Sequence, residues 1–316
     1  VITAEQVMQT LDMRQCIDLM KSALISLSRG DARQIVRPVL PLYDRNVLGM
    51  MPAFDAARNV AGVKILSVFP GNYAKNIPSH QGQVIVFETV TGNVKAIVDA
   101  DSLTGIRTAA VSAVATDVLA RPDASRLAIL GAGLQGRRHL EAMMLVRELT
   151  EVTVWDIRPE AAARYAEEMS AKTGLPVRVC DSAHEACQDA DIICTVTPAK
   201  EPILFAADVK KGAHINAIGA CTPDARELSS DLMAAGRLFV DWKPATVVEA
   251  GDYVLAVKDG LLTEEHILGE VGQVLAGDIE GRISPDDITI FEGLGQAVQD
   301  LAAADFVAEA LRRKED

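Results

Sequence analysis

The chain has 316 residues, of which 49% are hydrophobic and only 4% aromatic, and this composition is typical of a two-domain α/β protein with an aliphatic core. Its formal net charge of −13 would repel a phosphate backbone, so nucleic acid is not an expected partner. The five cysteines form no C-x-x-C pair and no apolar run approaches the roughly 18 residues that span a bilayer, so we expect a cytoplasmic protein without disulfides, metal or membrane contact.

The first hundred residues predict an α+β domain. Apolar residues at helical spacing predict a helix over residues 5–29. Strands and a hairpin, punctuated by Pro and Gly, are predicted in "VRPVLPLY", "LGMMPAF", "GVKILSVFP" and "GQVIVFETVTGNVKAIVDA". The stretch "LTGIRTAAVSAVATDVLA" has Ala, Val and Leu on all sides and predicts a fully buried helix.

From about residue 120, apolar strands alternate with helices, a pattern typical of a parallel sheet covered on both faces. Helices are predicted over 135–148, 159–171 and 182–189, and strands in "RLAILG", "EVTVWD", "VRVC", "DIICTVT", "HINAIGA" and "LFVD". The last segment, "GLGQAVQDLAAADFVAEAL", predicts a long helix that returns to the first domain. We therefore expect an α/β protein with a doubly wound Rossmann nucleotide-binding domain at 119–298 and an α+β domain formed by 1–118 and 299–316.

A glycine-rich turn joins the first of these strands to its helix. Gly131, Gly133 and Gly136 fit G-x-G-x-x-G, in which the first glycine allows the tight turn, the second lets a pyrophosphate approach and the third lets helix pack on strand. Asp156 ends the next strand about 20 residues on, the spacing at which an acidic side chain binds the adenosine ribose. The alternative is that the glycines serve turn geometry alone.

The choice of cofactor depends on Asp156 and Arg158. A carboxylate at Asp156 repels a 2′-phosphate and favours NAD, whereas Arg158 could pair with that phosphate, which keeps NADP possible. Thr195, Val196 and Thr197 end the strand that should pass beneath the adenine or its ribose, although threonines also suit strand ends for local reasons.

Three cations lie in apolar surroundings in the first domain. Lys64 is inside an apolar strand, Arg107 is in the buried helix, and Arg37 precedes a proline. Burying a cation costs several kcal/mol unless an anion meets it, so these residues indicate an anionic ligand such as a carboxylate substrate. The alternative is that Lys64 points to solvent and Arg107 pairs with an internal Asp or Glu.

Several long strings resemble the ornithine cyclodeaminase and μ-crystallin family, and the resemblance runs from about residue 4 to the end. They are "IPSHQGQVIVFETVTGNVKAIVDADSLTGIRTAAVSAVAT", "LAILGAGLQG", "EPILF", "GAHINAIGACTPDAREL" and "LGQAVQDLAAADFV". The chain is most similar to the μ-crystallin branch, whose members are ketimine reductases that reduce cyclic imino acids with NAD(P)H. The resemblance implies that the first domain binds substrate and pairs two subunits as a homodimer.

The resemblance also implies roles for single residues. Arg107 matches the clamp on the substrate carboxylate, Lys64 lies near the reacting nitrogen, and these two are the expected catalytic residues. The other expected substrate-binding residues are Arg37, Met51, His80, Cys221 and Asp224. The expected cofactor-binding residues are Thr108, Gly131, Gly133, Leu134, Gln135, Gly136, Asp156, Arg158, Thr195, Val196, Thr197, Ile218, Gly219 and Leu294.

Two departures from the family pattern bear on the reaction. Ornithine cyclodeaminases carry an aspartate where this chain has Cys221 and a glutamate where it has Gly49. Cyclodeamination needs a carboxylate that accepts a proton from the attacking amine, and neither residue does this equally well. Asp224 could substitute, although an Asp after Pro in a loop is more often a helix cap.

The expected function is therefore reduction of a cyclic imino carboxylate such as Δ1-pyrroline-2-carboxylate to L-proline, with NAD or NADP as cofactor. Three alternatives remain open: an ornithine cyclodeaminase that releases ammonia, an NAD-dependent L-amino-acid dehydrogenase acting on a substrate such as alanine, and a non-catalytic nucleotide-dependent binding protein. Lys64 and Arg107, both intact, argue against the last.

Overall fold

A computed structural model describes residues 1–75 and 77–315, and in it the chain divides into two compact units. Unit 1 contains residues 1–108 and the C-terminal residues from Gly295, and unit 2 is Ala109–Leu294. This division falls earlier in the chain than the expected boundaries at 118/119 and 298/299. The first boundary falls inside the helix α3 (Ala100–Leu119), which begins in unit 1 and ends in unit 2, and the second precedes the C-terminal helix.

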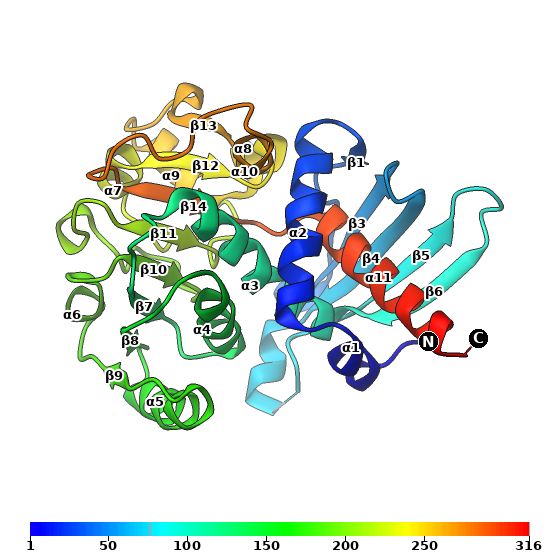
Figure 1. The fold of residues 1–316 in the computed structure, drawn as a ribbon, viewed down its shortest axis with the longest axis horizontal. Coiled ribbons are helices and arrows are strands. Elements are labelled where there is room, and N and C mark those ends of the chain that lie inside the picture. The colour runs from blue at the N-terminus through cyan, green and yellow to red at the C-terminus, as the bar shows by residue number, and fades with distance from the viewer. Residues whose placement is uncertain (76, 316) are drawn as a thin grey trace. The chain divides into compact units, whose positions relative to one another are not determined.

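Unit 1 is an antiparallel sheet with helices on one face. The strands run in the order β1-β3-β4-β5-β6, with β2 paired to β3. Figure 1 shows α11 lying across β3–β6 and α2 beside it. The bounds are α1 (Ala4–Thr10), α2 (Met13–Ser28), β1 (Ala32–Gln34), β2 (Val39–Pro41), β3 (Val47–Asp55), β4 (Val60–Val68), β5 (His80–Glu88), β6 (Val94–Asp99) and α11 (Ala297–Glu315), with 3-10 turns η1 (Tyr43–Arg45) and η2 (Pro70–Lys75).

Two helix predictions in unit 1 need correction. The single helix predicted over 5–29 is two helices, because the backbone is extended at Leu11 and Asp12 caps a new helix by accepting from the Gln15 N–H at 2.8 Å. The C-terminal helix begins at Ala297 rather than Gly293, since Gly295 has a left-handed φ of 75° that a helix interior excludes.

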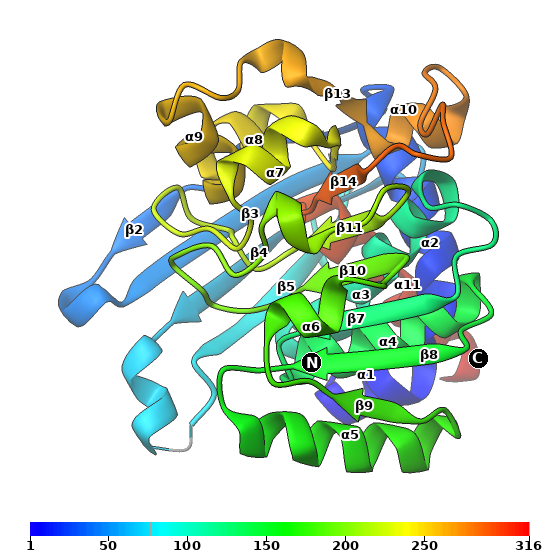
Figure 2. The same ribbon diagram turned by 90° about the vertical axis from the view of Figure 1, so that its left-hand side faces the viewer.

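Unit 2 is an eight-stranded sheet in the order β13-β12-β14-β11-β10-β7-β8-β9. Figure 2 shows β14, β11, β10, β7, β8 and β9 one below another. Its strand pairs are parallel, and the order reverses between β7 and β10, as in a doubly wound fold. The bounds are β7 (Arg126–Leu130), α4 (Leu134–Val146), β8 (Glu151–Trp155), α5 (Pro159–Thr173), β9 (Val177–Val179), α6 (Ala183–Cys187), β10 (Ile192–Thr195), η3 (Ala206–Asp208), β11 (His214–Ala217), α7 (Ser230–Ala235), β12 (Arg237–Val240), α8 (Lys243–Glu249), α9 (Gly251–Lys258), η4 (Glu264–His266), β13 (Ile267–Glu270), α10 (Val271–Ala276) and β14 (Thr289–Glu292).

This architecture confirms the predicted α/β class. The alternation of strands and helices predicts β7 to β12, but it does not predict β13 or β14. Both are four-residue strands, and β14 enters the sheet between β11 and β12, out of chain order. The aliphatic core of unit 2 fills the space between this sheet and its helices, with Leu130, Ile193 and Ile215 fully buried.

Candidate active site

The glycine turn of unit 2 has the shape that a pyrophosphate needs. A Cβ on Gly136 would overlap the Gly131 carbonyl oxygen, and Gly131 itself has a φ of 113° and packs against Val196. A Cβ on Gly133, in contrast, would meet nothing within 4 Å. Gly133 is the N-cap of α4, and in the described part of the chain this helix has no side-chain cap hydrogen bond. The turn therefore leaves open space at a helix N-terminus, and it fits a dinucleotide.

Asp156, which follows β8, is bonded to this turn. Its Oδ2 accepts from the Ala132 N–H at 2.9 Å, and its Oδ1 accepts from the Arg158 N–H at 2.9 Å and from Arg158 Nε at 3.3 Å. A carboxylate has about four lone-pair sites, so acceptor capacity for ribose hydroxyls remains. The structure therefore brings Asp156 and Arg158 together, and it adds a bond to the turn that the sequence spacing does not predict.

The other expected cofactor residues gather at the carboxyl ends of neighbouring strands. Thr195 ends β10 and is fully buried, and its carbonyl accepts from the Ile218 N–H at 3.0 Å. The Val196 N–H bonds the Leu130 carbonyl at 2.9 Å, which joins the ends of β10 and β7. Leu294 follows β14, and its N–H donates to Asp241 at 2.9 Å.

Glu227, which is not among the predicted site residues, connects the ends of β10 and β11. Both the N–H and the hydroxyl of Thr197 donate to Glu227 Oε1 at 2.6 Å, and the Gly219 N–H donates to Glu227 Oε2 at 2.7 Å. Glu227 is fully buried. The sequence shows it only as part of the string "DAREL", and nothing in its spacing indicates these partners.

Two expected substrate residues lie in the loop after β11. Cys221 is half-buried and donates to the Ile218 carbonyl at 3.3 Å. Asp224 is exposed, and it does not cap the following helix, because Ser229 is the N-cap of α7. Helix capping is therefore the wrong interpretation of Asp224.

The cations of unit 1 form a buried cluster around one carboxylate. Lys64 on β4 and Arg107 on α3 are 5% and 4% exposed. Lys64 Nζ lies 3.0 Å from Asp300 Oδ2, and Arg107 Nε lies 3.0 Å from Asp300 Oδ1. Lys64 therefore does not point to solvent, whereas Arg107 does pair with an internal acid. Asp300, on α11, is missing from the predicted set, although an Asp in an apolar helix is a signal that could have found it.

The cluster shifts the pKa values of its members. Burial alone would raise the pKa of the Asp300 carboxyl, but Arg107 and Lys64 outweigh that effect and hold it below its usual value. Burial lowers the pKa of the Lys64 ammonium from 10.5 to about 8, against the attraction of Asp300. Lys64 also donates to the Thr104 hydroxyl at 3.0 Å.

The remaining predicted residues of unit 1 have different surroundings. Met51 is directly opposite Lys64 in the β3–β4 pairing, so it shares the same buried face of the sheet. His80 begins β5 on that face, and its Nδ1 lies 3.0 Å from the Ser79 hydroxyl. Arg37 donates to the Gly295 carbonyl at 3.3 Å, and Thr108 follows Arg107 on α3.

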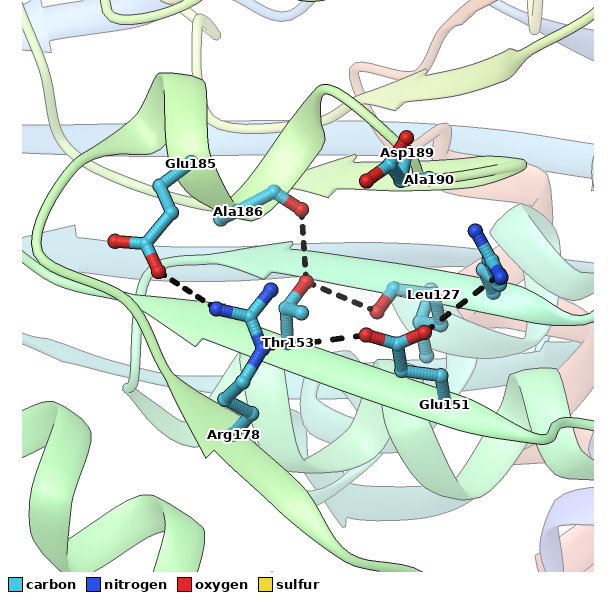
Figure 3. A pocket seen from close by; sticks show the side chains of 9 residues that line it. Leu127, Glu151, Thr153, Arg178, Glu185, Ala186, Asp189 and Ala190 are labelled. Carbon is cyan, nitrogen blue, oxygen red and sulfur yellow. Dashed lines mark hydrogen bonds and ion pairs between the residues drawn. The ribbon is translucent and has the colours of Figure 1, made fainter.

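A small cavity at the opposite end of the unit 2 sheet is not this site. It has a volume of about 10 Å³, and Arg126, Glu151, Arg178 and Glu185 line it in a row of ion pairs (Figure 3). Arg126 and Glu151 begin β7 and β8, so this cavity lies at the amino ends of the strands. A space of one water cannot hold a substrate.

Across residues 1–75 and 77–315, no cluster of three or more His, Cys, Asp or Glu side chains is arranged to hold a metal ion. In the same part of the chain, no helix combines the length and apolar character that spanning a membrane requires.

Comparison with known proteins agrees with this geometry. A family model described as the ornithine cyclodeaminase/mu-crystallin family matches residues 1–315. The ketimine reductase mu-crystallin of Mus musculus is 38% identical over 98% of this chain and 96% of its own length. Two solved structures are also similar. One is the Δ1-pyrroline-2-carboxylate reductase of Thermococcus litoralis in complex with NADH and L-proline, with a TM-score of 0.96 and 32% identity over 99% of this chain and 98% of that one. The other is an archaeal alanine dehydrogenase dimer with bound NAD, with a TM-score of 0.94 and 31% identity over 100% of this chain and 96% of that one. The chain belongs to the ornithine cyclodeaminase/mu-crystallin family.

Proposed function

We propose that the protein reduces cyclic imino carboxylates such as Δ1-pyrroline-2-carboxylate, giving L-proline, with NADH as the preferred reductant. The observation that carries the proposal is the cluster of Lys64 and Arg107 around Asp300. Two buried cations share one carboxylate, so an excess positive charge remains where an anionic substrate would neutralise it. The names of the mouse and Thermococcus relatives, a ketimine reductase and a pyrroline carboxylate reductase, support the same reaction.

Unit 2 is the proposed nucleotide-binding unit. Gly131, Gly133 and Gly136 would hold the pyrophosphate, and Asp156 would accept from the ribose hydroxyls. Arg158 is 64% exposed at its side chain and lies beside Asp156, which keeps NADP a second possible cofactor. When bound, the dinucleotide supplies the hydride that reduces the C=N carbon.

Unit 1 is the proposed substrate-binding unit. Arg107 Nε donates to Asp300 at 3.0 Å and Nη1 donates to Gln299 Oε1 at 3.3 Å, so Nη2 is the group proposed to bind a substrate carboxylate, with Nη1 joining it if the Gln299 bond is exchanged. Lys64 holds a proton at Nζ, and a pKa of about 8 keeps most of that proton in place at neutral pH. Lys64 is therefore suited to keep the imine nitrogen protonated, and a protonated imine is the better electrophile.

The loop after β11 favours reduction over cyclodeamination. Cys221 donates its S–H to a carbonyl, and Gly49 on β3 offers no side chain, so neither supplies the proton-accepting carboxylate of a cyclodeaminase. Asp224, the remaining candidate in the loop, is exposed to solvent.

The test is a comparison of three assays on one preparation. Rapid loss of NADH absorbance with Δ1-pyrroline-2-carboxylate, without ammonia release from L-ornithine plus catalytic NAD, is the expected result. Ammonia release without net cofactor change would instead indicate a cyclodeaminase, and NADH loss only with pyruvate plus ammonia would indicate an amino-acid dehydrogenase. Tight NADH binding with none of these activities would indicate a binding protein.

We also propose that the chain forms a homodimer through the outer face of the unit 1 sheet. Val63, Ile85 and Ile97 stand opposite one another across β4, β5 and β6, and each is only half-buried within one chain. Such a row of aliphatic side chains suits contact with a second copy.

We propose a cytoplasmic location. The five cysteines are all thiols and four are buried, which supports a reducing compartment.

A further inference from the structure

Glu227 occupies an unusual position for a carboxylate. It lies in the loop between β11 and α7, is fully buried, and receives three hydrogen bonds from two other segments: two from Thr197 to Oε1 and one from Gly219 to Oε2. Among the described residues, no Lys, Arg or His forms an ion pair with it. Burial raises the pKa of the Glu227 carboxyl, and the bonds from Thr197 and Gly219 oppose that shift. A buried carboxyl without these donors would be costly, so the three bonds stabilise the arrangement of the segments that supply them.

The two segments that Glu227 joins are the carboxyl ends of adjacent strands. Thr197 follows β10 and Gly219 follows β11, and the Thr197 carbonyl lies so close to Gly219 that a Cβ there would overlap it. Gly131 of the glycine turn packs against the same segment, with its ideal Cβ position 3.0 Å from Thr197 Cγ2. One carboxylate therefore fixes the edge at which a doubly wound sheet binds its ligand.

The backbone that carries Glu227 is itself held in place. Asp252, at the start of α9, accepts from the N–H groups of Glu227 and Leu228 with the same Oδ1 atom, each at 2.8 Å. Asp252 is also fully buried. The bonds to Asp252 thus fix the Glu227 backbone, and this fixed backbone places the Glu227 carboxylate beside Thr197 and Gly219.

We infer that Glu227 is a positioning residue for the dinucleotide: it sets the spacing of the two strand ends that border the nucleotide, and it does so without contact because no part of it reaches the surface. This inference rests on the proposed function, in that the ligand of this edge is taken to be NADH. It concerns binding of the nucleotide and makes no claim on the imine substrate.

Glu227→Gln is the direct test, because it changes the acceptor set and keeps the size. Three donors converge on Glu227, and a glutamine replaces one acceptor oxygen with an NH2 that faces another donor. We expect the Kd for NADH, measured by fluorescence titration, to rise about tenfold, the loss expected for one charge-assisted bond. Thermal unfolding of the same samples reports any change in stability.

Asp191→Asn is the matched control. Asp191 is a buried carboxylate that accepts from the Ser125 and Arg126 N–H groups at 3.0 Å each, but at the amino end of the same sheet. Unlike Glu227 it also pairs with Arg121 and Lys210, each at 2.8 Å. We expect this variant to lose thermal stability and to keep its Kd for NADH. If the two variants weaken NADH binding equally, or if Glu227→Gln leaves the Kd unchanged, the inference is overturned.

Two further outcomes are separable. If the unaltered protein does not bind NADH, the proposed function fails before this inference is tested. If Glu227→Gln does not fold, the test is hydrogen exchange of the Thr197 and Gly219 amides in the unaltered protein. Slow exchange that NADH slows further supports the inference. Fast exchange, or exchange that does not respond to NADH, overturns it.

Discussion

Arg107 and Asp300 bring opposite charges together in a site that solvent barely reaches, and Arg107 also donates from Nη1 to Gln299 at 3.3 Å. The clamp role predicts that Arg107→Ala raises KM for the imine and lowers kcat. A change of about 10- to 100-fold in kcat/KM is expected from the loss of charge-assisted bonds. Arg107→Lys is the control, because it keeps the charge and loses the planar fork, so it should recover activity only in part. Unchanged steady-state kinetics in Arg107→Ala would contradict the clamp.

The lowered pKa of Lys64 predicts that kcat/KM for the imine depends on pH. Its pKa of about 8 in the ligand-free chain means that the ammonium loses its proton as the pH rises through 8, so kcat/KM for the imine should fall in that range. Lys64→Met should remove this limb, while any limb that belongs to the substrate should remain.

Asp300→Asn tests whether the fall in kcat/KM above pH 8 belongs to Lys64. Asp300 attracts the Lys64 charge and raises its pKa against burial, so removing the carboxylate should move the limb to lower pH. A limb that stays in place in this variant would show that a different group titrates.

Single residues differ in how far the sequence predicts them. The glycine turn and Asp156 lie within about 25 residues of each other and follow a pattern with a steric reason at each position. Asp300 pairs with Arg107 across 193 residues of chain, and Glu227 binds Thr197 across 30. Spacing along the chain does not indicate which acid meets which base, so both acids had to come from the structure.

At the scale of elements, periodicity predicts the strands and helices of unit 2 but not their ends or their order. β13 and β14 lie beyond the regular alternation of strands and helices that predicts the equally short β10 to β12, and β14 enters the sheet out of chain order. The break between α1 and α2 depends on the capping of one aspartate, Asp12, within an otherwise helical spacing. The division between the units depends on where α3 packs, which no local pattern reports.

Asp252, at the start of α9, should make the free energy of unfolding depend on pH. Burial and the neighbouring Glu227 raise the pKa of Asp252. The folded chain therefore holds this proton more tightly than the unfolded chain, and the stability that the proton confers is lost as the pH rises above about 4. Asp252→Asn keeps an Oδ1 acceptor, so it should gain stability relative to the unaltered protein with rising pH, by up to about 1.4 kcal/mol per pH unit.

Urea unfolding at several pH values between about 3 and 8 measures this effect, and Asp191→Asn supplies a control of opposite sign. Burial of Asp191 would raise its pKa, but its bonds to Lys210 and to two backbone N–H groups lower it overall. Its contribution is fully present above the unfolded pKa of about 4, so the deficit of Asp191→Asn should stay constant from pH 8 down to about 5 and shrink only below about 4. Parallel curves for the two variants would contradict both assignments.

At the scale of the whole molecule, the proposed homodimer makes a prediction for the outer face of the unit 1 sheet. Ile85→Glu places a charge in the middle of the aliphatic row formed by Val63, Ile85 and Ile97, so it should convert the proposed dimer to a monomer that remains folded. Light scattering coupled to gel filtration measures the mass. Val179→Glu, which is 39% exposed on β9 of unit 2, is the control and should leave the mass unchanged. A dimeric Ile85→Glu variant would place the interface elsewhere.

The distribution of the five cysteines also has a practical consequence. Cys16, Cys180, Cys187 and Cys194 are buried, whereas Cys221 is half-buried in the loop beside Gly219. A thiol-specific dye should therefore modify about one equivalent per folded chain. The rate of that labelling would report occupancy of the neighbouring strand ends in real time, on the unaltered protein and without any turnover.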